Sequence, residues 1–127
     1  KVVQFFTHEV IYPGRRVNGQ STTDILLGVL ASFKSQHAIP FAGDGFGNYF
    51  AISYSVFNGE GGIYFFEHEN NYERPMWAAA SKIDKFLEFA IVEDSLGGVW
   101  PSEPSFIERT DPELKLCKRA PPLWLTD

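Results

Sequence analysis

A chain of 127 residues is long enough to bury one core without disulfides, and its 16% aromatic content excludes an intrinsically disordered protein. Sixteen acidic against eleven basic side chains give a formal charge of −5, which argues against direct binding to a nucleic-acid backbone. The lone Cys117 excludes an intrachain disulfide and a cysteine-rich zinc site. No apolar run reaches the roughly 18 residues of a membrane span. We therefore expect one domain over residues 1–127, in a reducing cytoplasm.

Short strands and a helix are expected in the first third of the chain. The runs 2–6 and 10–12 are rich in β-branched and aromatic residues, and a Pro-Gly turn follows the second run. Apolar residues then recur at helical spacing and predict a helix near 22–35, with Ser21 as its cap.

A hairpin and a second helix follow. Alternation of period two predicts a strand over 49–56, and the run 63–67 predicts its antiparallel partner across a longer loop. The segment 76–80 is ambiguous, with a short strand as one reading. Ser81, with an acid three residues later, predicts the start of a helix whose apolar stripe covers 83–91.

The last part of the chain carries five prolines. Asp111 followed by Pro112 predicts a short helix, with Asp as its cap and Pro at its first position. The rest of this segment is expected to run irregularly over the surface. Helix, hairpin and helix in this order indicate the α+β class, with an antiparallel sheet and helices packed against it.

The glycine-rich stretch 39–53 raises the first functional question. A phosphate cradle needs glycines that open a helix, so that backbone N–H groups face the anion. Here a strand follows the glycines, and no Lys-Ser/Thr pair is present. A structural turn fits better, because glycine allows positive φ and Asp or Asn bonds local amides. The residues predicted to form this turn are Gly43, Asp44, Gly45, Gly47 and Asn48.

The cluster Glu67-His68-Glu69 is the densest group of titratable residues. If its strand continues, Glu67 and Glu69 share one face, which is the arrangement of a two-carboxylate hydrolase. A metal site would need further ligands from distant histidines such as His8 or His37. The simpler alternative is a strand end that makes hydrogen bonds. No serine nucleophile motif or Cys/His pair is present. We therefore expect no catalytic residue, cofactor or metal.

Three ordered stretches resemble the SUKH superfamily, which includes the yeast cell-wall regulator domain and many bacterial toxin-immunity proteins. They are the corner 39–50 (IPFAGDGFGNYF), the strand 62–69 (GIYFFEHE) and the helix entry 80–87 (ASKIDKFL). No counterpart of the family's opening helix is recognisable before Val2. The resemblance implies an α+β fold with a curved sheet flanked by helices, and no catalytic chemistry.

This resemblance implies an immunity protein of the bacterial cytoplasm that neutralises a cognate toxin by stoichiometric occlusion. A regulatory or scaffold domain in a signalling assembly is the alternative. The acidic charge favours a basic partner, such as a nuclease domain. Tryptophans serve as interface anchors or, more commonly, as core residues. The candidate interface residues are acids and aromatics: Glu60, Glu67, Glu69, Tyr72, Glu73, Trp77, Glu93, Asp94 and Trp100.

Overall fold

The computed structural model describes most of the residues after residue 36 and a few before it. These residues are 4–5, 16–17, 20–21, 28, 31, 33, 37–44, 46–54, 61–97 and 100–123. The predicted strand 10–12 lies outside them, as does most of the predicted helix 22–35, of which residues 28, 31 and 33 are helical.

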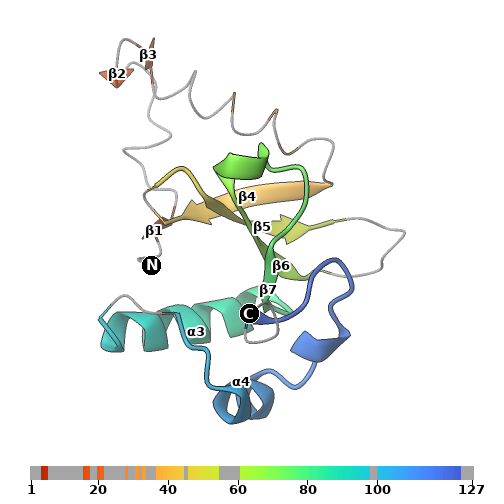
Figure 1. Cartoon of the computed structure of the whole chain (residues 1–127). Helices are drawn as coiled ribbons and strands as arrows, with labels where there is room; N and C mark the ends of the chain where they lie inside the picture. Colours follow the sequence, from red (N-terminus) through yellow and green to blue (C-terminus); the bar gives the residue numbers. More distant parts are fainter. Residues whose placement is uncertain are drawn as a thin grey trace.

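A five-stranded antiparallel sheet forms the centre of the molecule (Figure 1). Its strands, in spatial order, are β1 (Gln4–Phe5), β4 (Ala38–Gly43), β5 (Tyr49–Ser53), β6 (Ile63–Phe66) and β7 (Trp77–Ala80). A separate two-stranded sheet pairs β2 (Arg16–Val17) with β3 (Gln20–Ser21). The predicted antiparallel pairing of the segments 49–56 and 63–67 is confirmed, and the ambiguous segment 76–80 contains a strand.

Helical elements lie on both sides of this sheet. The longer ones are α3 (Ile83–Ser95) and α4 (Pro104–Thr110), and the 3₁₀ turns are η2 (His68–Asn70) and η3 (Leu114–Leu116). Figure 1 shows α3 and α4 below the sheet and η2 above it. The α+β class is therefore confirmed, with helices packed on an antiparallel sheet.

An aromatic cluster joins the sheet to α3. Phe50 of β5 lies 5.1 Å from Phe65 of β6 and 5.0 Å from Phe86 of α3, measured between ring centroids. Trp77 of β7 stacks on Phe65 at 5.0 Å, and Trp100 approaches Phe50 to 5.3 Å. Residues that alternate along paired strands share one face, so these rings form a continuous core on the α3 side.

The opposite face of the sheet carries a second aromatic group. Phe33 lies 4.8 Å from Phe66 and 5.0 Å from Tyr72, again between ring centroids, and Tyr49 lies 5.7 Å from Tyr72. Tyr72 belongs to the loop after η2. The loop between β6 and β7 is therefore anchored to the sheet by ring packing.

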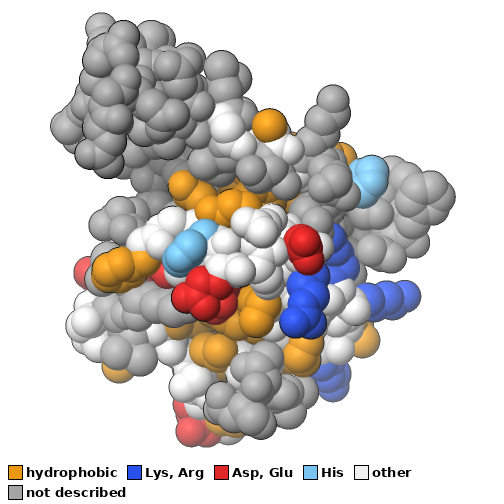
Figure 2. Space-filling model, turned by 45° about the horizontal axis from the view of Figure 1, so that its top comes forward, with side chains coloured by type: hydrophobic (Ala, Val, Ile, Leu, Met, Phe, Trp, Pro, Cys, Tyr) orange, Lys and Arg blue, Asp and Glu red, His pale blue; other side chains and the backbone are white. Residues whose placement is uncertain are grey.

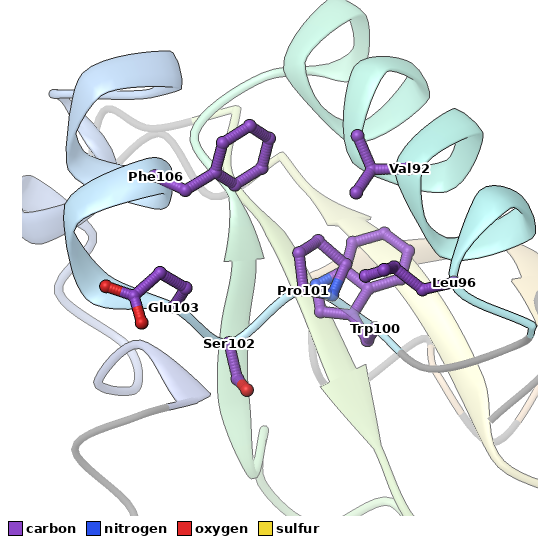
Figure 3. Close-up of a pocket in the computed structure, with 7 residues that line it drawn as sticks. All are labelled: Val92, Leu96, Trp100, Pro101, Ser102, Glu103 and Phe106. Carbon is purple, nitrogen blue, oxygen red and sulfur yellow. The ribbon is translucent and has the colours of Figure 1, made fainter.

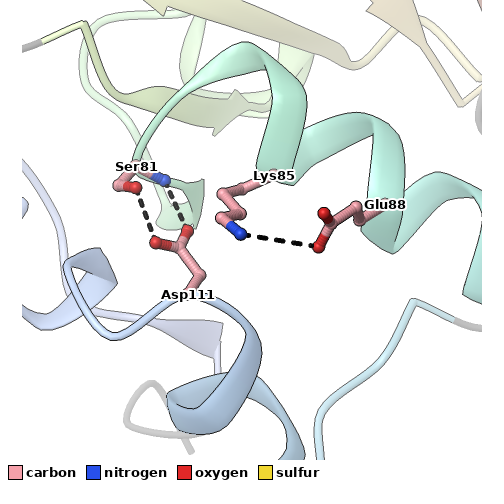
Figure 4. Close-up of polar contacts among 4 residues, drawn as sticks. All are labelled: Ser81, Lys85, Glu88 and Asp111. Carbon is pink, nitrogen blue, oxygen red and sulfur yellow. Dashed lines mark hydrogen bonds and ion pairs between the residues drawn. The ribbon is translucent and has the colours of Figure 1, made fainter.

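The predicted cap of α3 is wrong. Lys82 occupies the N-cap position and makes no side-chain cap hydrogen bond. Ser81 instead donates from its amide and its hydroxyl to the buried carboxylate of Asp111, at 2.8 and 2.6 Å (Figure 4). The same view shows an ion pair between Lys85 and Glu88 at 3.7 Å, which as a surface pair adds little stability.

The predictions for the C-terminal segment are correct only in that a short helical element, η3, follows Pro112, and its N-cap is Glu113 rather than Asp111. The helix of this segment begins at Pro104, where Glu103 accepts a hydrogen bond from the amide of Ser105, and it ends before Asp111. The residues after Asp111 form only a turn and the short η3. This segment is not an irregular surface strip, because its buried residues belong to the core: Trp100, Ile107, Leu114 and Ala120. Its end pairs with the outer edge of β7, through a bridge between Pro122 and Ala78.

Candidate partner-binding surface

The corner between β4 and β5 is organised by a buried carboxylate. Asp44 accepts hydrogen bonds from the amide of Phe46 at 2.9 Å and from the side-chain amide of Asn48 at 2.8 Å. The backbone N–H of Asp44 also donates to the carbonyl of Asn48 at 3.2 Å. A buried carboxylate is stable only when such donors replace water. Asp44 therefore closes the turn, and its buried carboxylate is hydrogen-bonded to the corner itself.

Glycine is required at two positions of this corner. Gly47 has a φ of +89°, a backbone conformation that side chains with a Cβ rarely adopt. A Cβ on Gly43 would lie only 3.0 Å from the carbonyl oxygen of Asn48. Both glycines are therefore needed for the backbone conformation of the turn, as the sequence predicted.

Asn48 connects the corner to η2. Because its Nδ2 donates to Asp44, its Oδ1 faces the other way and accepts from the backbone N–H of His68 at 3.0 Å. The Nδ1 of His68 lies 2.8 Å from the same oxygen. A carbonyl oxygen can only accept, so Nδ1 of His68 carries a proton.

Tyr72 makes the second connection between η2 and the corner. Its hydroxyl donates to the carbonyl of Gly47 at 2.5 Å. Burial, together with the charges of Tyr49 and Asp44, raises the pKa of Tyr72 to about 12. Burial and the charge of Asp44 also raise the pKa of Tyr49. Tyr72 therefore stays protonated at neutral pH and keeps its hydrogen bond. The turn around η2 is therefore bonded to the corner on both sides of the helix, through His68 and Tyr72.

The corner and the turn around η2 together present one surface. Phe46 at the tip of the corner is 75% exposed, and His68, Glu69 and Glu73 are exposed beside a half-buried Glu67. We call these five residues the corner–turn surface. Figure 2 shows an acidic patch directly beside a histidine, and a second acidic side chain farther to the right that lies against Lys and Arg side chains. A rigid backbone that carries an exposed aromatic ring and acids suits contact with a protein.

The predicted interface residues fall into three groups. Glu67, Glu69 and Glu73 lie on the corner–turn surface, with Tyr72 behind them. Trp77 and Trp100 are only 6% and 7% exposed and pack in the aromatic core, which is the alternative that the sequence left open for tryptophan.

The remaining three candidates lie elsewhere. Glu93 is buried on the inner side of α3, and Asp94 is exposed on the same helix, on the other side of the sheet from η2. Glu60 lies outside the described residues. Of the nine candidates, four therefore lie in the turn around η2.

The two-carboxylate arrangement of Glu67 and Glu69 does not form. The strand β6 ends at Phe66, and Glu67 is already the N-cap of η2. The two side chains therefore do not share a strand face. Within the described ranges, no group of three or more His, Cys, Asp or Glu residues is arranged to hold a metal ion. His68 forms the hydrogen bonds that the simpler interpretation of this cluster expected.

A cavity of about 290 Å³ lies between the end of α3 and the start of α4. Figure 3 shows Val92 of α3 and Phe106 of α4 on either side of it, with Trp100 and Pro101 between the helices. Its lining is apolar apart from Ser102 and Glu103. Glu103 already accepts a hydrogen bond from the hydroxyl of Ser105 at 2.8 Å. The cavity therefore holds no group of polar residues arranged for chemistry.

Two features of the corner–turn surface were missed from the sequence. Phe46 carries a signal that was overlooked, since a large apolar residue between two glycines in a turn has little chance of being buried. The bond between Asn48 and His68 has no local signal, because 20 residues separate them.

The sequence of the chain matches one family model. The description of that model is the SMI1 / KNR4 family (SUKH-1), and the match covers residues 12–88, which is more than half of the chain. The chain belongs to the SUKH-1 family. The corner, β6 and the entry to α3 all lie within the matched range. SUKH-1 proteins are generally non-enzymatic, and membership indicates binding to other proteins.

No curated protein and no solved structure matches the chain significantly. Among the described residues of this SUKH-1 chain, no helix has the length and apolar content to cross a bilayer.

Proposed function

We propose that this SUKH-1 chain is a bacterial immunity protein that neutralises a cognate toxin inside the cell that produces both. The mechanism is stoichiometric occlusion, in which one immunity protein covers the active cleft of one toxin. The observation that carries the proposal is the corner–turn surface, where rigid backbone presents Phe46 beside three acids. Such a surface supports recognition without any catalytic group.

The rigidity of this surface supports tight binding. Asp44 fixes the corner, Asn48 fixes His68, and Tyr72 is bonded to Gly47. A surface that is ordered before binding loses little conformational entropy when the partner arrives. Phe46 is the side chain placed to enter a pocket on the partner, as buried aromatic anchors do in other interfaces.

The charge of the chain supports a basic partner, such as a nuclease domain. The formal charge is −5, and three acids, Glu67, Glu69 and Glu73, belong to the turn around η2. Opposite charge raises the association rate and helps to exclude acidic proteins. Association with the toxin is therefore expected to slow as ionic strength rises.

The test is binding to a toxin encoded beside this chain. We expect co-expression to restore growth, and titration of the purified proteins to end at one chain per toxin. The double variant Glu69→Lys/Glu73→Lys should lower the association rate about tenfold or more. The control is Glu108→Lys/Glu113→Lys, which changes the charge equally at exposed sites in the C-terminal segment.

Two outcomes would count against this proposal. If co-expression does not restore growth and no complex forms, the chain is not the immunity protein of that toxin. If both double variants slow association equally, the association rate depends only on the net charge of the chain, and the corner–turn surface is not the contact.

A regulatory or scaffold domain in a signalling assembly is the second candidate. The same surface would then bind a component of that assembly. The SUKH-1 family includes such a regulator, so membership is compatible with this role. A stable partner from the native host that is not a toxin, together with no rescue of growth, would favour this role.

A further inference from the structure

Helix α3 carries an apolar surface that the described part of the fold leaves uncovered. Ile83, Leu87 and Ile91 are 44%, 45% and 72% exposed. We call these residues the α3 stripe. Single exposed aliphatic residues are common on protein surfaces, but three in a row on one helix form a patch that is typical of an interaction site.

The spacing of the three residues makes the stripe continuous. Positions four apart in a helix lie one above the other, so Ile83, Leu87 and Ile91 form a single ridge. The core contacts of α3 come from Phe86 and Phe89, which are 0% and 1% exposed and point elsewhere on the helix. The stripe is therefore a second apolar face, separate from the one that holds α3 on the sheet.

Acidic side chains border the stripe. Asp84 follows Ile83 directly, and Asp94 lies about one turn after Ile91, at the other end of the ridge; both are exposed. Among the described residues, no ion pair joins either of them to a base, whereas Glu88 further around the helix pairs with Lys85. The helix thus presents apolar residues with negative charge at their edge.

We propose that the α3 stripe docks an amphipathic helix of another protein, one with an apolar face flanked by Lys or Arg. Such a helix would lay its apolar face along the ridge and place its bases against Asp84 and Asp94. This is helix–helix packing, in which the ridge of side chains on α3 fits a groove between side chains of the partner helix. It does not depend on the toxin-binding role, and it uses the opposite side of the sheet from η2.

The acidic residues beside the α3 stripe favour a basic helix over two other possible partners, a second copy of the chain and a membrane surface. A second copy of the chain, packed stripe against stripe, would bring Asp84 and Asp94 close to the same acids, and the chain already carries a charge of −5. A membrane surface attracts helices whose polar face is rich in Lys and Arg, whereas this stripe is bordered by acids. A basic segment satisfies both the apolar and the acidic residues.

The experiment uses synthetic peptides as probes of the whole chain. One peptide is an amphipathic leucine–lysine helix, the second has the same pattern with glutamate in place of lysine, and the third is the first with its order shuffled. We expect the chain to bind the leucine–lysine helix by calorimetry or fluorescence, to bind the shuffled peptide less, and not to bind the glutamate peptide. Leu87→Lys should weaken this binding about tenfold or more, the effect of losing one buried aliphatic contact and adding a repelling charge.

Leu116→Lys is the matched control, because Leu116 is 66% exposed on η3, away from the stripe. This variant should bind the leucine–lysine helix like the unchanged chain. Equal loss in both variants, or equal binding of the lysine and glutamate peptides, would overturn the proposal.

Further measurements test the other occupants. Sedimentation should show no self-association that Leu87→Lys removes, and vesicles of phosphatidylcholine and phosphatidylglycerol should not bind the chain. Self-association that Leu87→Lys removes would assign the stripe to a second copy of the chain, and binding to the vesicles would assign it to a membrane; either result would overturn the proposal. Leu87→Lys should also leave the denaturation midpoint nearly unchanged. A large loss of stability would mean that the stripe is covered in the free chain, which contradicts the proposal.

Discussion

The sheet segment, residues 38–80, and the C-terminal segment, residues 100–123, are held in place by different kinds of interaction. The sheet segment builds its four strands by pairing neighbours along the chain, with a turn or loop between each pair. The C-terminal segment instead places single side chains into distant elements. Trp100 reaches Phe50, and Asp111 reaches Ser81.

This difference corresponds to the limit of the family match, which covers the whole sheet segment and ends at residue 88. The sheet segment lies entirely within the matched range, and it carries the corner–turn surface. The C-terminal segment completes the core beneath α3 and covers the outer edge of β7, where Ala78 donates to the carbonyl of Pro121 at 2.8 Å. An uncovered edge strand is prone to pair with other chains, so this cover also protects the sheet.

The largest effect is expected when the C-terminal segment loses its aromatic anchor. Trp100 contacts rings from both the sheet and α3, so Trp100→Ala should lower the free energy of unfolding by about 3–5 kcal/mol. Chemical denaturation measures this loss. Leu116→Ala is the control from the same segment, with an expected change within about 0.5 kcal/mol because the side chain is exposed. Similar small effects for both variants would show that the segment adds nothing to the core.

A smaller effect is expected at the polar contact between the segment and the start of α3. Asp111→Ala leaves the amide and the hydroxyl of Ser81 without their acceptor, so it should cost about 2–3 kcal/mol of stability. A double-mutant cycle with Ser81→Ala measures the shared part of this energy. The double variant should be more stable than the sum of the single losses predicts. Strict additivity would mean that the contact does not form in solution.

The smallest effect is expected at the corner–turn contact of the sheet segment. Tyr72 has an unfolded pKa near 10 and a folded pKa of about 12, so folding favours its protonated form. Its contribution to stability is therefore complete below pH 10 and is lost as pH rises toward 12. Tyr72→Phe should remove this part of the pH dependence and cost about 1 kcal/mol at neutral pH through the lost bond to Gly47. An identical alkaline slope in both proteins would contradict the assignment.

The sequence predicted the features that depend on neighbouring residues. Alternation identified β5, β6 followed across the loop, and the glycines with Asp44 and Asn48 indicated a turn. Each of these signals lies within a few positions along the chain, so chain geometry alone is enough to read it.

Features that depend on distant partners were missed. Ser81 looks like a helix cap because an acid follows three residues later, but the carboxylate of Asp111, 30 residues away, takes both of its donors. Ile107 and Leu114 lie in separate short elements, so their burial leaves no periodic pattern. Trp77 and Trp100 illustrate the same limit, because composition does not reveal which tryptophans are covered.

The most direct test of the account is hydrogen exchange on the complex with a toxin encoded beside this chain. If the toxin binds the corner–turn surface, the amides of residues 46–48 and 67–73 should exchange more slowly in the complex than in the free chain, and the exchange of α4 should not change. Protection confined to α4 and the C-terminal segment, with the corner exchanging as in the free chain, would contradict it.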